Sequence, residues 1–150
     1  MNLKLKIKTD INSALKKQAK KKLEVLRFLD AQIKNKEIEQ GRRELTDQEI
    51  LQLINQQIKK VRESLALFKR GGRKDLADKA QIELEILKSY LPVQLSDQDL
   101  EIEIDRLLKE NPETDQPGKI IGLAVKKLAG RADNQRVAQL VTQKFRQKEG

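Results

Sequence analysis

The sequence contains no cysteine and no histidine among its 150 residues. The absence of cysteine excludes disulfides, thiol redox chemistry and thiolate-bound zinc, and it fits a reducing compartment. The absence of histidine removes the commonest general base, the commonest transition-metal ligand and every catalytic arrangement built on an imidazole. Together these absences argue against an enzyme, and we expect no cofactor and no metal site.

Long apolar runs are also missing. No segment approaches the roughly 20 consecutive apolar residues that a membrane-spanning helix needs. The first ten residues, MNLKLKIKTD, alternate lysine with apolar residues, whereas a signal peptide separates the two. We therefore expect a cytoplasmic protein with no membrane partner and no small-molecule substrate.

Aromatic residues form only 3% of the chain, so Leu, Ile and Val must fill its core. These residues recur at helical spacing along most of the sequence. The first stripe predicts a helix from Leu3 to Ile33, and it consists of Leu3, Ile7, Ile11, Leu15, Ala19, Leu23, Leu26, Leu29 and Ile33.

Capping signals set the bounds of the later helices. Thr46 and Glu49 form a predicted capping box, and the helix that follows them ends at Gly71-Gly72. The remaining expected helix starts are Asp75, Ser96, Pro117 and Asp133, and the expected stops are Pro92, Asn111-Pro112 and Gly130.

The pattern predicts an all-α protein. A multihelical N-terminal domain is expected over residues 1–91 and a small three-helix bundle over residues 96–150, with a linker at about 92–95. Pro92 and an abrupt change of charge motivate this boundary.

The net charge of +9 is unevenly distributed along the chain. Residues 1–44 carry 13 Lys and Arg against 6 Asp and Glu, residues 92–117 carry 2 against 8, and residues 118–150 carry 8 against 2. Basic ends of this kind suit a polyanion or an acidic partner, and they also suit a surface that only promotes solubility.

The acidic residues of the middle segment could be proposed as a metal or acid-base site. They are Asp97, Asp99, Glu101, Glu103 and Asp105. The first of them fall in the first turn of a predicted helix, where the backbone dipole favours negative charge, so we interpret the run as structural.

The C-terminal domain holds a cluster of cations that is typical of phosphate contact. Its members are Lys119, Lys126, Lys127, Arg131, Arg136 and Lys144. Arg131 is not needed for the turn that Gly130 and Asp133 form, so it is either a phosphate contact or half of an ion pair. Gly118 and Gly122 share one helix face and are predicted to admit a packed helix or a nucleic-acid backbone.

The segment GKIIGLAVKKLAGRADNQRVAQLV resembles the C-terminal signature of the YqeY-like family. That family is similar to the tail of the B subunit of the tRNA-dependent Asp/Glu amidotransferase. LRFLDAQIKNKEIEQGRRELTDQEIL and FKRGGRKDLADKAQIELEILKSYLPVQLSDQDL extend the resemblance over almost the whole chain. Asn134, Ile121 and Val125 depart from the family pattern, in which a glycine and two methionines are usual.

The resemblance implies a helical RNA-binding module without catalytic parts. We expect it to bind tRNA, or to assist tRNA-dependent amidation, mainly through the C-terminal bundle. Lysines 16, 17, 20, 21 and 22 offer a second basic surface. The alternative is a protein-interaction adaptor that docks on an amidotransferase or an aminoacyl-tRNA synthetase.

Overall fold

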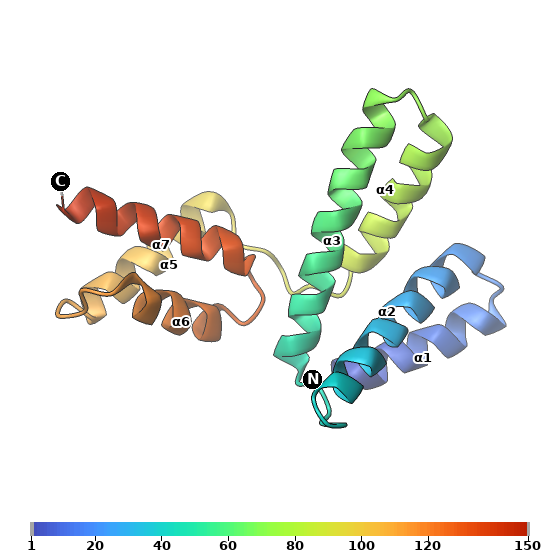
Figure 1. Ribbon diagram of the computed structural model, residues 1–150, viewed down its shortest axis with the longest axis horizontal. Coiled ribbons are helices and arrows are strands. Elements are labelled where there is room, and N and C mark those ends of the chain that lie inside the picture. Colours follow the sequence, from blue (N-terminus) through green and yellow to red (C-terminus); the bar gives the residue numbers. More distant parts are fainter. Residues whose placement is uncertain (1, 150) are drawn as a thin grey trace. The chain divides into compact units, whose positions relative to one another are not determined.

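The computed structural model describes residues 2–149, and in this range it contains helices and turns but no strand (Figure 1). The predicted all-α class is therefore confirmed. The Cα positions separate into two compact units, residues 1–91 and residues 92–150. Whether each unit folds independently stays a prediction. We call them the N-terminal unit and the C-terminal unit.

The N-terminal unit consists of two antiparallel helical hairpins (Figure 1). Helices α1 (Leu3–Lys16) and α2 (Lys20–Glu39) form the first hairpin, and α3 (Asp47–Arg70) and α4 (Lys74–Lys88) form the second. Apolar side chains from all four helices meet in one core, and the most deeply buried are Leu3, Ile7, Leu26, Leu29, Ile33, Ile50, Ile54 and Leu87.

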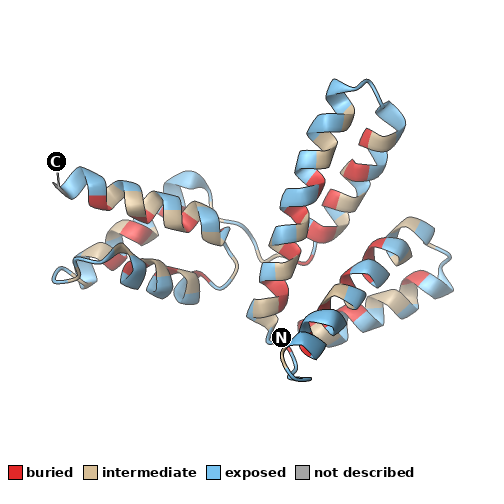
Figure 2. Ribbon diagram, in the orientation of Figure 1, coloured by how far each residue is buried: buried red, intermediate tan, exposed pale blue. Residues whose placement is uncertain are grey.

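The C-terminal unit is a three-helix bundle of α5 (Asp97–Glu110), α6 (Pro117–Leu128) and α7 (Asn134–Glu149). Its core is separate from that of the N-terminal unit and includes Leu100, Ile104, Ile120, Ala124 and Val141. Figure 2 shows buried residues along the inner face of each helix, which is the amphipathic pattern read from the sequence.

The predicted single helix from Leu3 to Ile33 is wrong, because the chain reverses at Lys17–Ala19 between α1 and α2. Leu15, which the stripe places in the core, is 54% exposed, and Ala14 is buried instead. The residues that face the core therefore follow one helical register in α1 and a different one in α2.

A Schellman motif ends α1. The Ala19 N–H donates to the Ala14 carbonyl at 2.9 Å and the Gln18 N–H donates to the Leu15 carbonyl at 3.3 Å, with Gln18 in the left-handed region at φ +57°. The ends of α2 and α3 use the same motif, but glycines occupy the left-handed position there, Gly41 at φ +73° and Gly72 at φ +68°. Gln18 is therefore the strained member of the three.

Most predicted helix starts are confirmed, and one is wrong. The Thr46 hydroxyl and the Glu49 carboxylate form the capping box of α3, and the Ser96 hydroxyl accepts a hydrogen bond from the Asp99 N–H at the start of α5. Asp75 does not cap α4, because the helix already begins at Lys74. Asp75 lies in its first turn and forms an ion pair with Arg73.

A buried carboxylate joins the two hairpins at their base. Lys4 Nζ on α1 donates to both oxygens of Glu37 on α2 at 2.9 Å, and the Leu45 N–H donates to Glu37 Oε2 at 2.9 Å. Nearby, the Leu3 N–H donates to Asp47 Oδ1 at the start of α3, also at 2.9 Å. The Lys4 ammonium, assisted by the Leu45 amide, lowers the pKa of Glu37.

A second polar contact joins α1 to the end of α4. The Tyr90 hydroxyl donates to Asp10 Oδ2 at 2.5 Å, and Lys6 Nζ lies 3.1 Å from the same oxygen and 5.2 Å from the centre of the Tyr90 ring. Burial, together with the hydrogen bond to Asp10, raises the pKa of Tyr90, which therefore stays protonated. The first and last helices of the unit are fixed to each other by this contact.

Replacing Gln18 by Gly is expected to stabilise the protein by about 0.5–1 kcal/mol, because glycine adopts the left-handed conformation without strain. The converse substitution, Gly72→Ala, should destabilise it by a similar amount, since nothing lies within 4 Å of an added Cβ and only the backbone is strained. Urea denaturation measures both changes. A loss of stability in Gln18→Gly contradicts the assigned turn.

Glu37→Gln is expected to lower the free energy of unfolding at pH 7 by roughly 1–3 kcal/mol, since a buried charge-assisted network loses its anion. Because the folded pKa of Glu37 lies below its usual value of 4.5, its contribution is complete above that pH and is lost as the pH falls through the folded pKa. The difference between wild type and variant should therefore shrink on acidification. A difference that is the same at pH 3 and pH 7 rules out the ionised network.

Candidate nucleic-acid interface

The acidic row on α5 pairs with half of the cations predicted to bind nucleic acid. Lys144 Nζ on α7 lies 2.6 Å from Glu101 Oε1 and 3.1 Å from Asp105 Oδ1, and its side chain is only 18% exposed. These two carboxylates raise the pKa of Lys144. Lys144 is therefore a neutralised link between α5 and α7.

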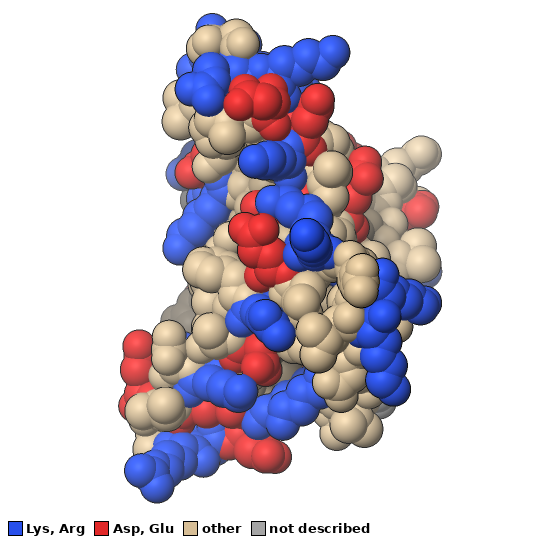
Figure 3. All heavy atoms as spheres, turned by 90° about the vertical axis from the view of Figure 1, so that its right-hand side faces the viewer, with Lys and Arg blue, Asp and Glu red and all other residues tan. Residues whose placement is uncertain are grey.

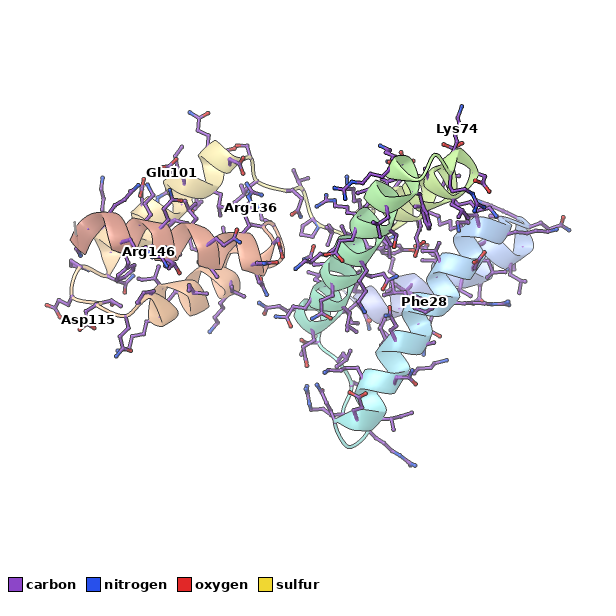
Figure 4. All side chains as sticks on the ribbon, turned by 45° about the horizontal axis from the view of Figure 1, so that its top comes forward. Phe28, Lys74, Glu101, Asp115, Arg136 and Arg146 are labelled. Atoms are coloured by element: carbon purple, nitrogen blue, oxygen red, sulfur yellow. The ribbon has the colours of Figure 1, made fainter. Side chains whose placement is uncertain are left out.

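Arg136 and Lys127 are held in the same way. The Arg136 guanidinium forms an ion pair with Asp97 at 2.5 Å and donates to the Leu95 carbonyl at 3.3 Å. Lys127 Nζ on α6 lies 3.6 Å from Glu103 Oε2. Figure 4 labels Glu101 on α5 and Arg136 on α7, the two helices that these ion pairs connect. The acidic run is structural, as predicted, but its role extends beyond the first turn.

The other three predicted cations remain available to a ligand. Lys119, Lys126 and Arg131 are exposed, and no ion pair joins them to any acidic side chain that the structure describes. The ion-pair alternative for Arg131 thus finds no partner between residues 96 and 116. Lys119 and Lys126 both belong to α6, and Arg131 follows the end of that helix.

The outer face of α6 is flat and partly basic. A helix turns by about 100° per residue, so Gly118, Lys119, Gly122, Leu123 and Lys126 fall within one sector of α6. All five residues are exposed, whereas Ile120, Ala124 and Leu128 face the core (Figure 2). Two lysines are therefore presented next to two positions that have no side chain.

Within the C-terminal unit, Gly118 and Gly122 do not pack against another helix. A Cβ added at either glycine meets no atom within 4 Å among the described residues. Both glycines are exposed because α6 rests on α5 and α7 with its opposite face. A glycine in a helix costs about 1 kcal/mol relative to alanine, and internal packing does not account for that cost here.

The N-terminus of α6 also faces outward. Pro117 occupies the first helical turn, as predicted, and Gln116 at the N-cap makes no side-chain hydrogen bond to the helix amides. No side chain neutralises the positive end of the helix dipole there, although Pro117 has no N–H and the Lys119 N–H donates to the Gln116 carbonyl at 3.2 Å. This end of α6 is the end that carries Gly118 and Lys119.

Arg131 lies in a turn between α6 and α7, where its N–H donates to the Leu128 carbonyl at 3.0 Å. Ala129 and Gly130 both adopt positive φ angles, +46° and +83°, so the left-handed conformation begins one residue before the predicted terminator Gly130. Ala132 is 2% exposed and fills the core, and the Asp133 carboxylate accepts a hydrogen bond from the Gln135 N–H at 3.4 Å at the start of α7. The Arg131 side chain, in contrast, is exposed and makes none of these contacts.

The segment predicted as a linker belongs in part to the C-terminal unit. The Leu95 N–H donates to the Arg131 carbonyl at 2.8 Å, and Gln94 Nε2 donates to the Gly130 carbonyl at 2.9 Å. Leu95 also packs against the core of the bundle. Sequence reasoning missed these contacts, because a short extended segment without a capping or periodic pattern carries no signal of its partner.

Residues 2–148 contain neither a membrane-spanning helix nor a cluster of metal-binding side chains. No helix has both the length and the apolar character needed to cross a membrane. No group of three or more acidic side chains is arranged to hold a metal ion.

The sequence matches known proteins over most of its length. The model of the Yqey-like protein family matches residues 4–145. The chain is 29% identical over 135 residues to a protein of Pyrenophora tritici-repentis named "Altered inheritance of mitochondria protein 41, mitochondrial", and the match covers 85% of this chain and 71% of that protein. The protein of the same name from Eremothecium gossypii is 32% identical over 107 residues, which are 69% of this chain and 58% of that relative.

The chain thus spans between about half and three quarters of the length of these relatives. The family match, in contrast, includes all seven helices of the described structure at least in part. The protein belongs to the Yqey-like protein family.

Proposed function

We propose that this protein is a non-enzymatic RNA-binding module that binds tRNA through the C-terminal unit. The observation that carries the proposal is the outer face of α6, where Lys119 and Lys126 stand beside the exposed Gly118 and Gly122. A phosphate backbone can approach a helix closely where side chains are missing, and the two ammonium groups neutralise its charge. Arg131 extends this surface beyond the C-terminal end of the helix.

The composition of the face favours reading of shape over reading of bases. It offers charge, the positive end of the α6 dipole and one apolar side chain, Leu123, but no aromatic ring on which an unpaired base stacks. Double-stranded RNA is recognised in this manner, through phosphates and the wide, shallow minor groove. The choice of tRNA rests on the resemblance to the amidotransferase tail, and the cytoplasmic location remains part of the proposal.

The first test is Arg131→Ala, with binding of bulk tRNA measured at several salt concentrations. We expect an affinity roughly threefold to tenfold lower and a slope of log affinity against log salt that is flatter by about one unit, since one phosphate contact is lost. Thermal stability should not change, because the Arg131 side chain takes part in no ion pair among residues 2–148.

Lys109→Ala is the matched control, because Lys109 is an exposed cation in the last turn of α5 within the same unit. It should leave both the affinity and the salt slope close to their wild-type values. If both substitutions lower the tRNA affinity equally, binding depends only on the net charge of the protein and not on the position of Arg131. An absence of tRNA binding by the wild-type protein removes the proposed function altogether.

Gly122 allows a test in which stability and binding change in opposite directions. Gly122→Leu should stabilise the protein by about 0.5–1 kcal/mol, because leucine is a better helix former and nothing lies within 4 Å of the added Cβ. The same side chain should weaken tRNA binding at least about tenfold if an RNA backbone approaches here. Gln139→Leu, at an exposed position of α7, controls for added apolar surface. Unchanged tRNA affinity in Gly122→Leu excludes the face of α6 from the interface.

A further inference from the structure

The two hairpins of the N-terminal unit diverge from their shared base toward their turns, and a groove lies between them (Figure 1). Its volume is about 330 Å³. Gln57 closes the inner end, because it accepts a hydrogen bond from Gln32 on α2 and donates one to Glu83 on α4. Beyond this polar bridge the groove opens toward the turns Lys17–Ala19 and Gly71–Arg73. We call it the inter-hairpin groove.

The floor of the inter-hairpin groove is apolar. Val61 and Phe68 of α3 and Leu76 and Ala80 of α4 line it. Phe28 on α2 lies seven residues after Lys21, which also lines the groove, and four before Gln32, so the three side chains share one face of the helix. Phe28 is 53% exposed and is labelled on α2 in Figure 4, although it is not itself one of the residues that line the groove.

The distribution of phenylalanine is informative, since the chain has only three. Phe145 is buried in the C-terminal core, whereas Phe68, which lines the groove, is only partly buried and Phe28 on α2 is exposed. Exposed apolar surface of this kind, framed by polar residues, marks a site of interaction.

The rim of the groove is cationic. Lys21, Lys60 and Lys79 stand along it against a single carboxylate, Glu83, which lies at the closed end. Further cations follow at both turns, and Figure 3 shows Lys and Arg side chains over the turn between α3 and α4. A ligand must therefore be apolar in the middle and negatively charged on both flanks.

We propose that the inter-hairpin groove binds an amphipathic α-helix of a protein partner, with apolar residues on one face and Asp or Glu beside them. A helix is about 10 Å in diameter and packs against neighbouring helices at 8–10 Å, so it completes the diverging hairpins as a further layer. A phosphate backbone satisfies the lysines but leaves the aliphatic floor uncovered. This proposal concerns the N-terminal unit and does not depend on tRNA binding by the C-terminal unit.

The test uses the full chain and a synthetic 18-residue peptide that has leucines on one helix face and glutamates on both flanks. Fluorescence anisotropy should show saturable binding in the micromolar range. A peptide of the same composition in scrambled order, and one with lysine in place of each glutamate, should bind at least about tenfold more weakly, because one lacks the apolar face and the other repels the rim.

Paired charge reversals locate the site. Lys60→Glu with Lys79→Glu should weaken peptide binding about tenfold or more, whereas Arg62→Glu with Lys88→Glu changes the same charge on other faces of α3 and α4 and should have little effect. Phe28→Ser should weaken binding without any change of charge. If either double Glu variant lowers the melting temperature, the double Gln variant at the same two positions is used in its place.

Several results overturn the proposal. They are the absence of saturable peptide binding, equal binding of the scrambled peptide, and equal effects of the two reversal pairs. A loss of tRNA affinity in Lys60→Glu with Lys79→Glu, without a loss of peptide affinity, assigns the groove to RNA. If the wild type self-associates and the variant with Lys60→Glu and Lys79→Glu does not, the inter-hairpin groove instead binds a second copy of the chain.

Discussion

The arrangement of the N-terminal unit depends on one buried anion, Glu37. Apolar side chains of both hairpins share one core, and this carboxylate is bound by α1 through Lys4 and by the segment before α3 through the Leu45 amide. A buried carboxylate cannot give up either donor without a penalty, so the base of the two hairpins has one favoured geometry. The divergence of the helices above that base, and hence the inter-hairpin groove, follows from where this contact is placed.

In the C-terminal unit, charge pairing decides which cations a partner can reach. Six basic side chains looked equivalent in the sequence, yet α5 neutralises Lys127, Arg136 and Lys144 and leaves Lys119, Lys126 and Arg131 exposed. The acidic helix therefore stabilises the bundle and at the same time narrows the basic surface to α6 and the turn after it. The candidate interface is smaller and better defined than the net charge of the unit suggests.

Local signals in the sequence were sufficient for the helical class, the capping box at Thr46 and the starts at Ser96 and Pro117, because these features depend on residues only a few positions apart. The turn at Gln18 could not be predicted in this way. It lacks the glycine that marks the equivalent turns at Gly41 and Gly72, and the core, not the local sequence, imposes the reversal. The ion pairs between α5 and α7 and the exposure of Gly122 likewise depend on which helices pack against each other. The periodicity of apolar residues does not identify the neighbours of a helix.

The contact between residues 94–95 and the turn at Gly130–Arg131 has a mechanical consequence. The chain that leaves the N-terminal unit is hydrogen-bonded to the backbone on which Arg131 sits, before it reaches the first helix of the bundle. These hydrogen bonds couple the backbone position of residues 94 and 95 to that of the turn that carries Arg131. A displacement of the connecting segment therefore moves the Arg131 turn unless these two hydrogen bonds break.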